Sequence, residues 1–228
     1  GDIIPYRDPK LLTQFINQPQ EKIVAAITGA LALGKSDAIL AAGRIVQGAL
    51  KGNLFQQLGR EINALVEKGS IPADFANKKY GFQSFSELLE FIDSKVPDED
   101  RFQAIKALFY AVILESEGEA IANYQLFKIS KALSSTQFLI LKYCYELHKE
   151  GTWDSILQNS HEIWVIYISE KIGHKIRELV VNDEQLLIDL ALITKRTHND
   201  LSGISSHNCR LTDLGIMLIE KMNKYSKL

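Results

Sequence analysis

The sequence predicts a mainly α-helical protein with two parts: a helical bundle over residues 1–130, and an α+β module with one small β-hairpin over residues 131–228. Apolar residues recur at the three- and four-residue spacing of helices through the first 130 residues. The period-two alternation that marks strands is almost absent there. Near the end of the chain, a turn-rich segment separates two short apolar runs, which predicts the hairpin.

The composition is that of an ordinary globular protein. The chain of 228 residues carries 26 Lys+Arg and 28 Asp+Glu, a formal net charge of -2, and 46% of its residues are hydrophobic. These values exclude a disordered chain, a collagen-like repeat and a strongly basic protein that wraps nucleic acid. The length is sufficient for one large or two small domains with a buried core.

Helix-breaking residues and the spacing of apolar residues predict where the first helices of the bundle lie. The segment from Ile23 to Leu50 predicts two helices joined near Gly34. Gly52-Asn53 is expected to break the second of them. An amphipathic stripe from Leu54 to Val66 then predicts a third helix, which is expected to end at Gly69, because glycine readily adopts the left-handed conformation that closes a helix.

Capping residues place the later helices of the bundle. Ser84 and Glu87 have the spacing of a capping box, in which the serine accepts a free helix N–H and the glutamate returns the bond. Pro97 and Asp98 predict the start of the next helix, because proline biases the residue before it out of the helical region. That helix is expected to be long, since only Gly118 interrupts it weakly.

The C-terminal module opens with a second capping box, Ser134-x-x-Gln137, whose helix is expected to end at Gly151. Residues 161–172 are so apolar that periodicity cannot separate a buried helix from a strand. Asn182 is expected to cap a helix over residues 183–192.

The end of the module has the most specific pattern. Leu192 to Thr194 predicts a strand, residues 197–206 a loop, and Asn208 to Leu211 a returning strand, after which Thr212-x-x-Gly215 opens a last helix. This order resembles a winged helix-turn-helix domain, over about residues 134–222. The resemblance implies that the helix before the wing reads the major groove of DNA.

The charge of this winged-helix-like module argues against DNA as its partner. The candidate recognition helix, Asp183 to Leu190, has three carboxylates and no Lys or Arg, and residues 131–228 hold 12 Lys+Arg and 12 Asp+Glu. Phosphate neutralisation dominates DNA affinity, so a protein partner or self-association is the preferred interpretation. The candidate DNA contacts, around the predicted wing, are Lys195, Arg196 and Arg210.

Residues 29–36 match the phosphate-binding loop pattern G-x-x-x-x-G-K-[ST]. In such a loop, backbone N–H groups between Gly29 and Gly34 hold phosphates, Lys35 reaches the outer phosphates and Ser36 binds a magnesium ion. The loop requires a mostly parallel sheet, whereas the Ala-Leu-Ala-Leu interior of this segment favours a helix. Two joined helices are therefore preferred, with a nucleotide-binding enzyme as the alternative.

No other motif for catalysis, a metal or a cofactor is found in the sequence. Cys144 and Cys209 form no disulfide framework, which predicts reduced thiols and a cytoplasmic location. No apolar run reaches the ~18 residues of a membrane-spanning helix. The apolar segment Ile23 to Gly52 supports a third hypothesis, membrane association or self-assembly. The prediction for the whole chain is a non-enzymatic interaction or regulatory protein.

Overall fold

The structure is a computed structural model, which describes residues 50–72, 75, 78–94, 98–151, 162–173, 175–195 and 208–226. These residues form eight α-helices and one 3-10 turn, and the chain divides into two compact units between Phe127 and Lys128. The phosphate-loop match, Gly29 to Ser36, and almost all of the segment Ile23 to Gly52 lie outside the described residues. None of the described helices combines the length and the apolar character needed to cross a bilayer.

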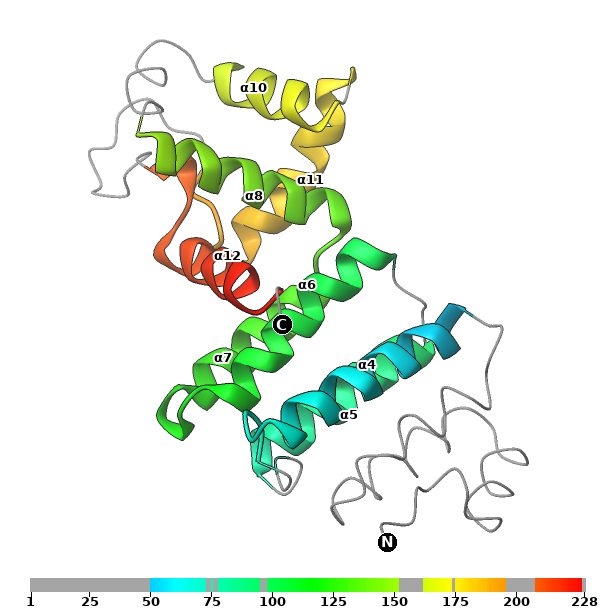
Figure 1. The fold of residues 1–228 in the computed structure, drawn as a ribbon. Helices are drawn as coiled ribbons and strands as arrows, with labels where there is room; N and C mark the ends of the chain where they lie inside the picture. Colours follow the sequence, from blue (N-terminus) through cyan, green and yellow to red (C-terminus); the bar gives the residue numbers. More distant parts are fainter. Residues whose placement is uncertain are drawn as a thin grey trace, which may run out of the picture. The chain divides into compact units, whose positions relative to one another are not determined.

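The described part of the N-terminal unit is a succession of helices: α4 (Leu50–Glu67), α5 (Lys79–Ser94), α6 (Glu99–Leu114) and α7 (Glu117–Lys131), the last of which continues past the division between the units. α5 contacts both α4 and α6, and it runs beside α4 in Figure 1. Buried rings fill the core of this unit. The ring centroid of Phe85 lies 5.6 Å from that of Phe75 and 5.5 Å from that of Phe109.

Three predicted helix boundaries of this unit are wrong. α4 runs through Gly52-Asn53 without a break. α5 begins before Ser84, which is buried inside the helix and donates its hydroxyl to the carbonyl of Tyr80 at 2.6 Å, one turn back, instead of capping a helix start. The single long helix expected after Asp98 is two helices, α6 and α7, because the chain turns at Glu115 and Ser116.

Two other boundaries of this unit are confirmed. Gly69 follows the end of α4 and has a φ of +74°. This left-handed conformation closes the helix, as expected for glycine. Asp98 is the N-cap of α6, and its side chain accepts a hydrogen bond from the backbone N–H of Arg101 at 2.9 Å.

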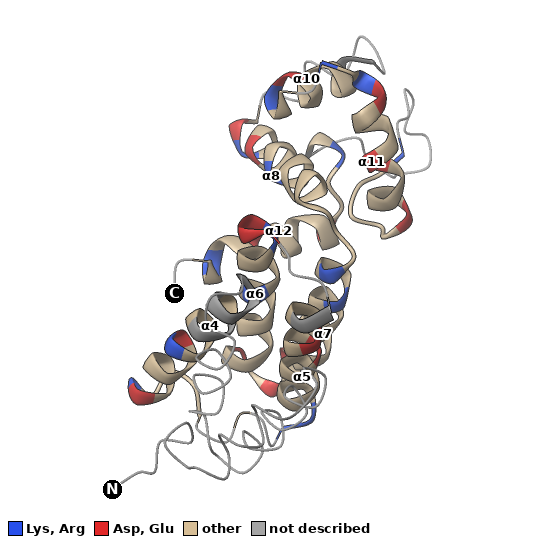
Figure 2. Cartoon of the chain, turned by 90° about the vertical axis from the view of Figure 1, so that its right-hand side faces the viewer, with Lys and Arg blue, Asp and Glu red and all other residues tan. Residues whose placement is uncertain are grey.

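In the C-terminal unit, α8 (Ser135–Glu150) contacts each of the other described elements: α10 (Glu162–Ile172), α11 (Arg177–Asp189), the 3-10 turn η3 (Asn208–Arg210) and α12 (Asp213–Tyr225). Figure 1 shows these elements arranged around α8. Figure 2 shows that α8, α10 and α11 carry residues of both charge signs.

The predicted ends of α8 are confirmed, and the ambiguous apolar stretch is a helix. Ser134 and Gln137 form the capping box, and Gly151, with a φ of 72°, closes the helix. Residues 162–172 form α10, with Trp164 fully buried. The prediction for Asn182 is wrong, because this residue lies inside α11 instead of before it.

The predicted β-hairpin is not seen in the described residues. Ile193 and Leu211 form one isolated antiparallel bridge, beside a hydrogen bond of 2.8 Å from the N–H of Thr194 to the carbonyl of Arg210. Cys209 (φ 54°) and Arg210 (φ 70°) adopt left-handed conformations, which turn this segment instead of extending it as a strand. The described fold is therefore all-helical, and the expected α+β module with its wing is corrected accordingly.

Candidate ligand-binding site

The three cations predicted to contact DNA are placed very differently. Lys195 is exposed, Arg196 lies outside the described residues, and Arg210 is only 2% exposed. The guanidinium of Arg210 donates from Nη1 to Oε2 of Glu184 at 2.8 Å and from Nε to the carbonyl of Thr194 at 3.0 Å. Its carbon Cζ lies 4.2 Å from the centroid of the Trp164 ring. This enclosure leaves Arg210 no surface on which to receive a phosphate.

The same ion pair corrects the interpretation of α11 as an acidic recognition helix. The predicted recognition helix would present Glu184 to DNA as one of three carboxylates, but this residue is 4% exposed and neutralised by Arg210. The two residues are 26 positions apart. Neither the helical periodicity of α11 nor the charge count of the module could reveal this pairing.

The motif Thr212-x-x-Gly215, which carried the winged-helix resemblance, has a structural role. The hydroxyl of Thr212 accepts a hydrogen bond from the N–H of Gly215 at 3.0 Å and donates one to the carbonyl of Ala191 at 2.6 Å. A Cβ at position 215 would overlap the carbonyl of Leu192. The threonine thus caps α12, as predicted, and the glycine lets residue 192 approach the helix.

The two cysteines of the chain, Cys144 and Cys209, are free, fully buried and close to each other. Burial, followed by the neighbouring Cys144, raises the pKa of the Cys209 thiol above its ordinary value. Because the thiolate is the reactive form of cysteine, Cys209 is not placed as a nucleophile.

A polar cluster in the N-terminal unit is also fully paired. Lys106 Nζ lies 2.7 Å from Oε2 of Glu61, and the hydroxyl of Tyr110 donates to the same oxygen at 2.7 Å. Burial, and then the charge of Glu61, raise the pKa of Tyr110 above its ordinary value. These contacts join α4 to α6 and give the cluster a structural role.

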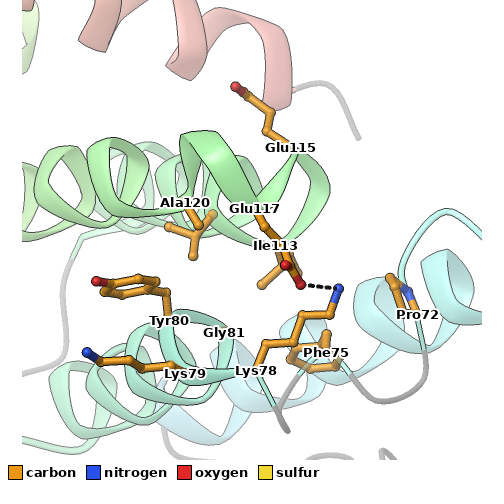
Figure 3. Close-up of a pocket in the computed structure, with 11 residues that line it drawn as sticks. Pro72, Phe75, Lys78, Lys79, Tyr80, Gly81, Ile113, Glu115, Glu117 and Ala120 are labelled. Atoms are coloured by element: carbon orange, nitrogen blue, oxygen red, sulfur yellow. Dashed lines mark ion pairs between the residues drawn. The ribbon is translucent and has the colours of Figure 1, made fainter.

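A pocket of about 330 Å³ opens in the N-terminal unit where the starts of α5 and α7 approach the end of α6 (Figure 3). This volume is at the lower end of the range for ligand pockets, about 300–1,000 Å³. The described residues that line it come from the segment before α5, from these three helices and from the turn between α6 and α7: Pro72, Phe75, Lys78, Lys79, Tyr80, Gly81, Val112, Ile113, Glu115, Glu117 and Ala120.

The interior of the pocket is apolar because of a close backbone contact. A Cβ at Gly81 would overlap the carbonyl of Phe75, so only glycine lets Phe75 lie against the first turn of α5. The ring of Phe75, 2% exposed, then joins the aromatic core on one side of the pocket. Val112 and Ile113, at the end of α6, line the same space.

Four charged side chains line the pocket, two of each sign, and one Lys and one Glu among them are in contact at its mouth. Lys78 Nζ lies 3.3 Å from Oε1 of Glu117, and the two side chains are 51% and 82% exposed. Figure 3 shows them pointing toward each other, whereas Glu115 is directed away from the pair. Lys79 lies over the ring of Tyr80, with Nζ 5.2 Å from the ring centroid.

The described lining includes no Ser, His or Cys side chain. Nor do the described residues bring together three or more His, Cys, Asp or Glu side chains that could hold a metal ion. The arrangement is suited to binding an apolar group under a charged mouth. Sequence analysis missed this pocket, because its residues come from separate elements and none stands out by its local pattern.

No protein-family model, curated protein or solved structure matches the chain. The chemistry of the described residues is therefore the basis for a function.

Proposed function

We propose that the protein is a non-enzymatic binding protein whose N-terminal unit takes a small apolar group into the pocket between α5, α6 and α7. The observation that carries this proposal is the cavity of about 330 Å³ with its apolar interior, provided by residues such as Phe75, Val112 and Ile113. Removing apolar surface from water contributes roughly 25 cal/mol per Å². An apolar group that fills this space therefore gains affinity without any covalent chemistry.

The test is to titrate the full chain with indole as an apolar probe and to follow the backbone amides by NMR. We expect shifts confined to the pocket lining. Ala120→Leu should weaken binding by about 10-fold or more, because the larger side chain occupies the space that the probe needs. Ala122→Leu is the matched control, since Ala122 is exposed on the same helix and does not line the pocket. Equal affinity of both variants would contradict the proposal.

A second candidate function is association with another chain through the C-terminal unit, in line with the sequence-based prediction of a protein partner or self-association. Three apolar side chains around the start of α11 are exposed: Ile176 (58%), Leu179 (45%) and Val181 (40%). Exposed Arg177 and Glu178 adjoin them in the chain. Charges of both signs beside apolar residues suit pairing with a second copy of the same surface.

Sedimentation velocity over a concentration series tests this second candidate. The native chain should dimerise, and Leu179→Ser should shift it toward monomer. Met217→Ser is the control, because Met217 is 40% exposed in the same unit but lies on α12. A native chain that stays monomeric at all concentrations would remove self-association through α11.

A further inference from the structure

We infer that the ligand of this pocket is a free amino acid with an apolar side chain, whose carboxylate binds Lys78 and whose ammonium binds Glu117. This inference rests on the proposed function, since it requires the pocket to take an apolar group. It adds the chemical class of the ligand: a zwitterion whose two charges lie next to one apolar side chain.

The charges at the mouth are arranged for such a ligand. Lys78 immediately precedes α5, and Glu117 is the first residue of α7, so the two charges come from two different elements of the pocket lining. Figure 3 shows the pair meeting close to Phe75 and Ile113, which belong to the apolar lining. A ligand whose side chain enters the pocket therefore carries its own charged groups to this pair.

The Lys78–Glu117 pair can be opened easily. The side chains of Lys78 and Glu117 are 51% and 82% exposed, and Nζ of the lysine lies 3.3 Å from Oε1 of the glutamate. Exposed ion pairs of this kind contribute little to stability, because water already solvates both partners. An inserted zwitterion supplies a new partner to each side, whereas a ligand with a single charge leaves one of the two side chains without one.

The size of the pocket points to a single amino acid. A volume of about 330 Å³ is at the lower end for ligand pockets, so it suits a side chain such as that of phenylalanine better than a nucleotide or a folded peptide segment. A free amino acid carries its ammonium and carboxylate on the same carbon. A residue within a peptide carries neither, and a chain terminus carries only one.

The first measurement is calorimetric titration of the full chain with L-phenylalanine and three analogues. The analogues are 3-phenylpropionate, which lacks the ammonium, 2-phenylethylamine, which lacks the carboxylate, and N-acetyl-L-phenylalaninamide, which carries no charge. We expect L-phenylalanine to bind about 10-fold more tightly than either singly charged analogue, the effect of one hydrogen bond to a charged group.

Two variants separate the roles of the charges. Lys78→Met should weaken the binding of L-phenylalanine and 3-phenylpropionate, whereas 2-phenylethylamine should bind at least as tightly as before, because Lys78 no longer competes with it for Glu117. Glu117→Gln should have the opposite selectivity between the two analogues. The matched controls are Lys68→Met and Glu119→Gln, because both residues are exposed and neither lines the pocket.

The outcomes separate this inference from the proposed function. If indole binds in the pocket but the four phenyl ligands bind equally well, the inference of a zwitterionic ligand is wrong, whereas the proposal of an apolar binding pocket is supported. The same conclusion follows if Lys78→Met and Glu117→Gln fail to show the crossed pattern. If neither indole nor L-phenylalanine binds, the proposed function fails together with the inference.

Discussion

Each unit contains an ion pair between segments that are distant in the sequence, and the two pairs differ in their contact with water. Arg210 and Glu184, in the C-terminal unit, have side chains only 2% and 5% exposed, at a separation of 2.8 Å. Lys106 and Glu61, in the N-terminal unit, are 2.7 Å apart, but the glutamate is 24% exposed. One pair is thus enclosed and the other is open at its carboxylate.

The chemistry of the two cations explains this difference. The guanidinium of Arg210 has several donors in a fixed plane, and both Glu184 and the carbonyl of Thr194 accept from it while Trp164 covers its face. The ammonium of Lys106 is a compact charge that is strongly hydrated in water. Burying a whole ion pair carries a large desolvation penalty. The exposed carboxylate of Glu61 retains part of its hydration.

The largest expected effect follows from breaking the enclosed pair. Arg210→Met should lower the free energy of unfolding by about 3–5 kcal/mol, because Glu184 would be left buried without its partner. Both tryptophans of the chain, Trp153 and Trp164, belong to the C-terminal unit, so urea unfolding followed by tryptophan fluorescence reports on that unit. The double variant Arg210→Met/Glu184→Leu should recover part of the loss. A single variant as stable as the native chain would show that the pair is dispensable.

The next largest effect is expected at the two glycines that lie against a backbone carbonyl. Gly215→Ala and Gly81→Ala should each destabilise the chain by about 1–3 kcal/mol, because the added methyl group forces a backbone carbonyl to move. Gly215→Ala should cost more, since its Cβ would also lie 3.2 Å from Leu211, against 3.8 Å between a Cβ at Gly81 and Ile113. Denaturant titration measures both.

Gly118→Ala is the control for the glycine variants. A Cβ there would meet only Ser116, at 3.9 Å, inside an exposed helical turn. Alanine is the better helix former, so this variant should be slightly more stable than the native chain. Equal losses at all three glycines would mean that the close carbonyl contacts have no effect.

A smaller effect is expected from the open pair. Lys106→Met should cost about 1–2 kcal/mol, because water can solvate Glu61 and Tyr110 still donates to it. Hydrogen exchange of peptides from α4 and α6 should show the loss in the N-terminal unit, with the exposed Lys68→Met as control. A loss as large as that of Arg210→Met would break the proposed difference between the two pairs.

The smallest effect concerns pH. Burial, and then the 2.6 Å hydrogen bond to Glu87, raise the pKa of Tyr124 from 10.0 to about 12. The unfolded chain therefore loses this proton first, so stability is unaffected below pH 10 and falls between pH 10 and 12. Relative to Tyr124→Phe, the native chain should lose about 1 kcal/mol between pH 9 and pH 11. Parallel pH profiles of the two proteins would contradict the raised pKa.

The sequence was sufficient to predict a helix start where the interaction that produces it lies within one turn of the chain. The capping residues Asp98, Ser134 and Thr212 each satisfy an N–H within one turn, so spacing alone identified them. Ser84 and Asn182 have equally good capping chemistry but lie inside α5 and α11, which begin several residues before them. Ser84 is fully buried, which is a tertiary effect that no local pattern indicates.

The contacts of the candidate site residues were harder to predict than the helices. Arg210 belongs to a sequence motif that resembles a wing, and its partner Glu184 is on a helix that precedes it by 26 residues. The pocket depends on Gly81, which has no side chain and so leaves room for the carbonyl of Phe75. It also depends on two charges located at the starts of different helices. Such contacts between separate elements require the three-dimensional arrangement.

The burial of both native thiols has a practical consequence for spectroscopy. Since Cys144 and Cys209 are fully buried, and burial raises the pKa of the Cys209 thiol, a cysteine introduced on the surface would react with a maleimide well before either of them. Ile121→Cys is a suitable position, because Ile121 is 55% exposed and follows Ala120 of the pocket lining. A fluorophore attached there would test the proposed binding to the pocket in a chain that keeps its native cysteines.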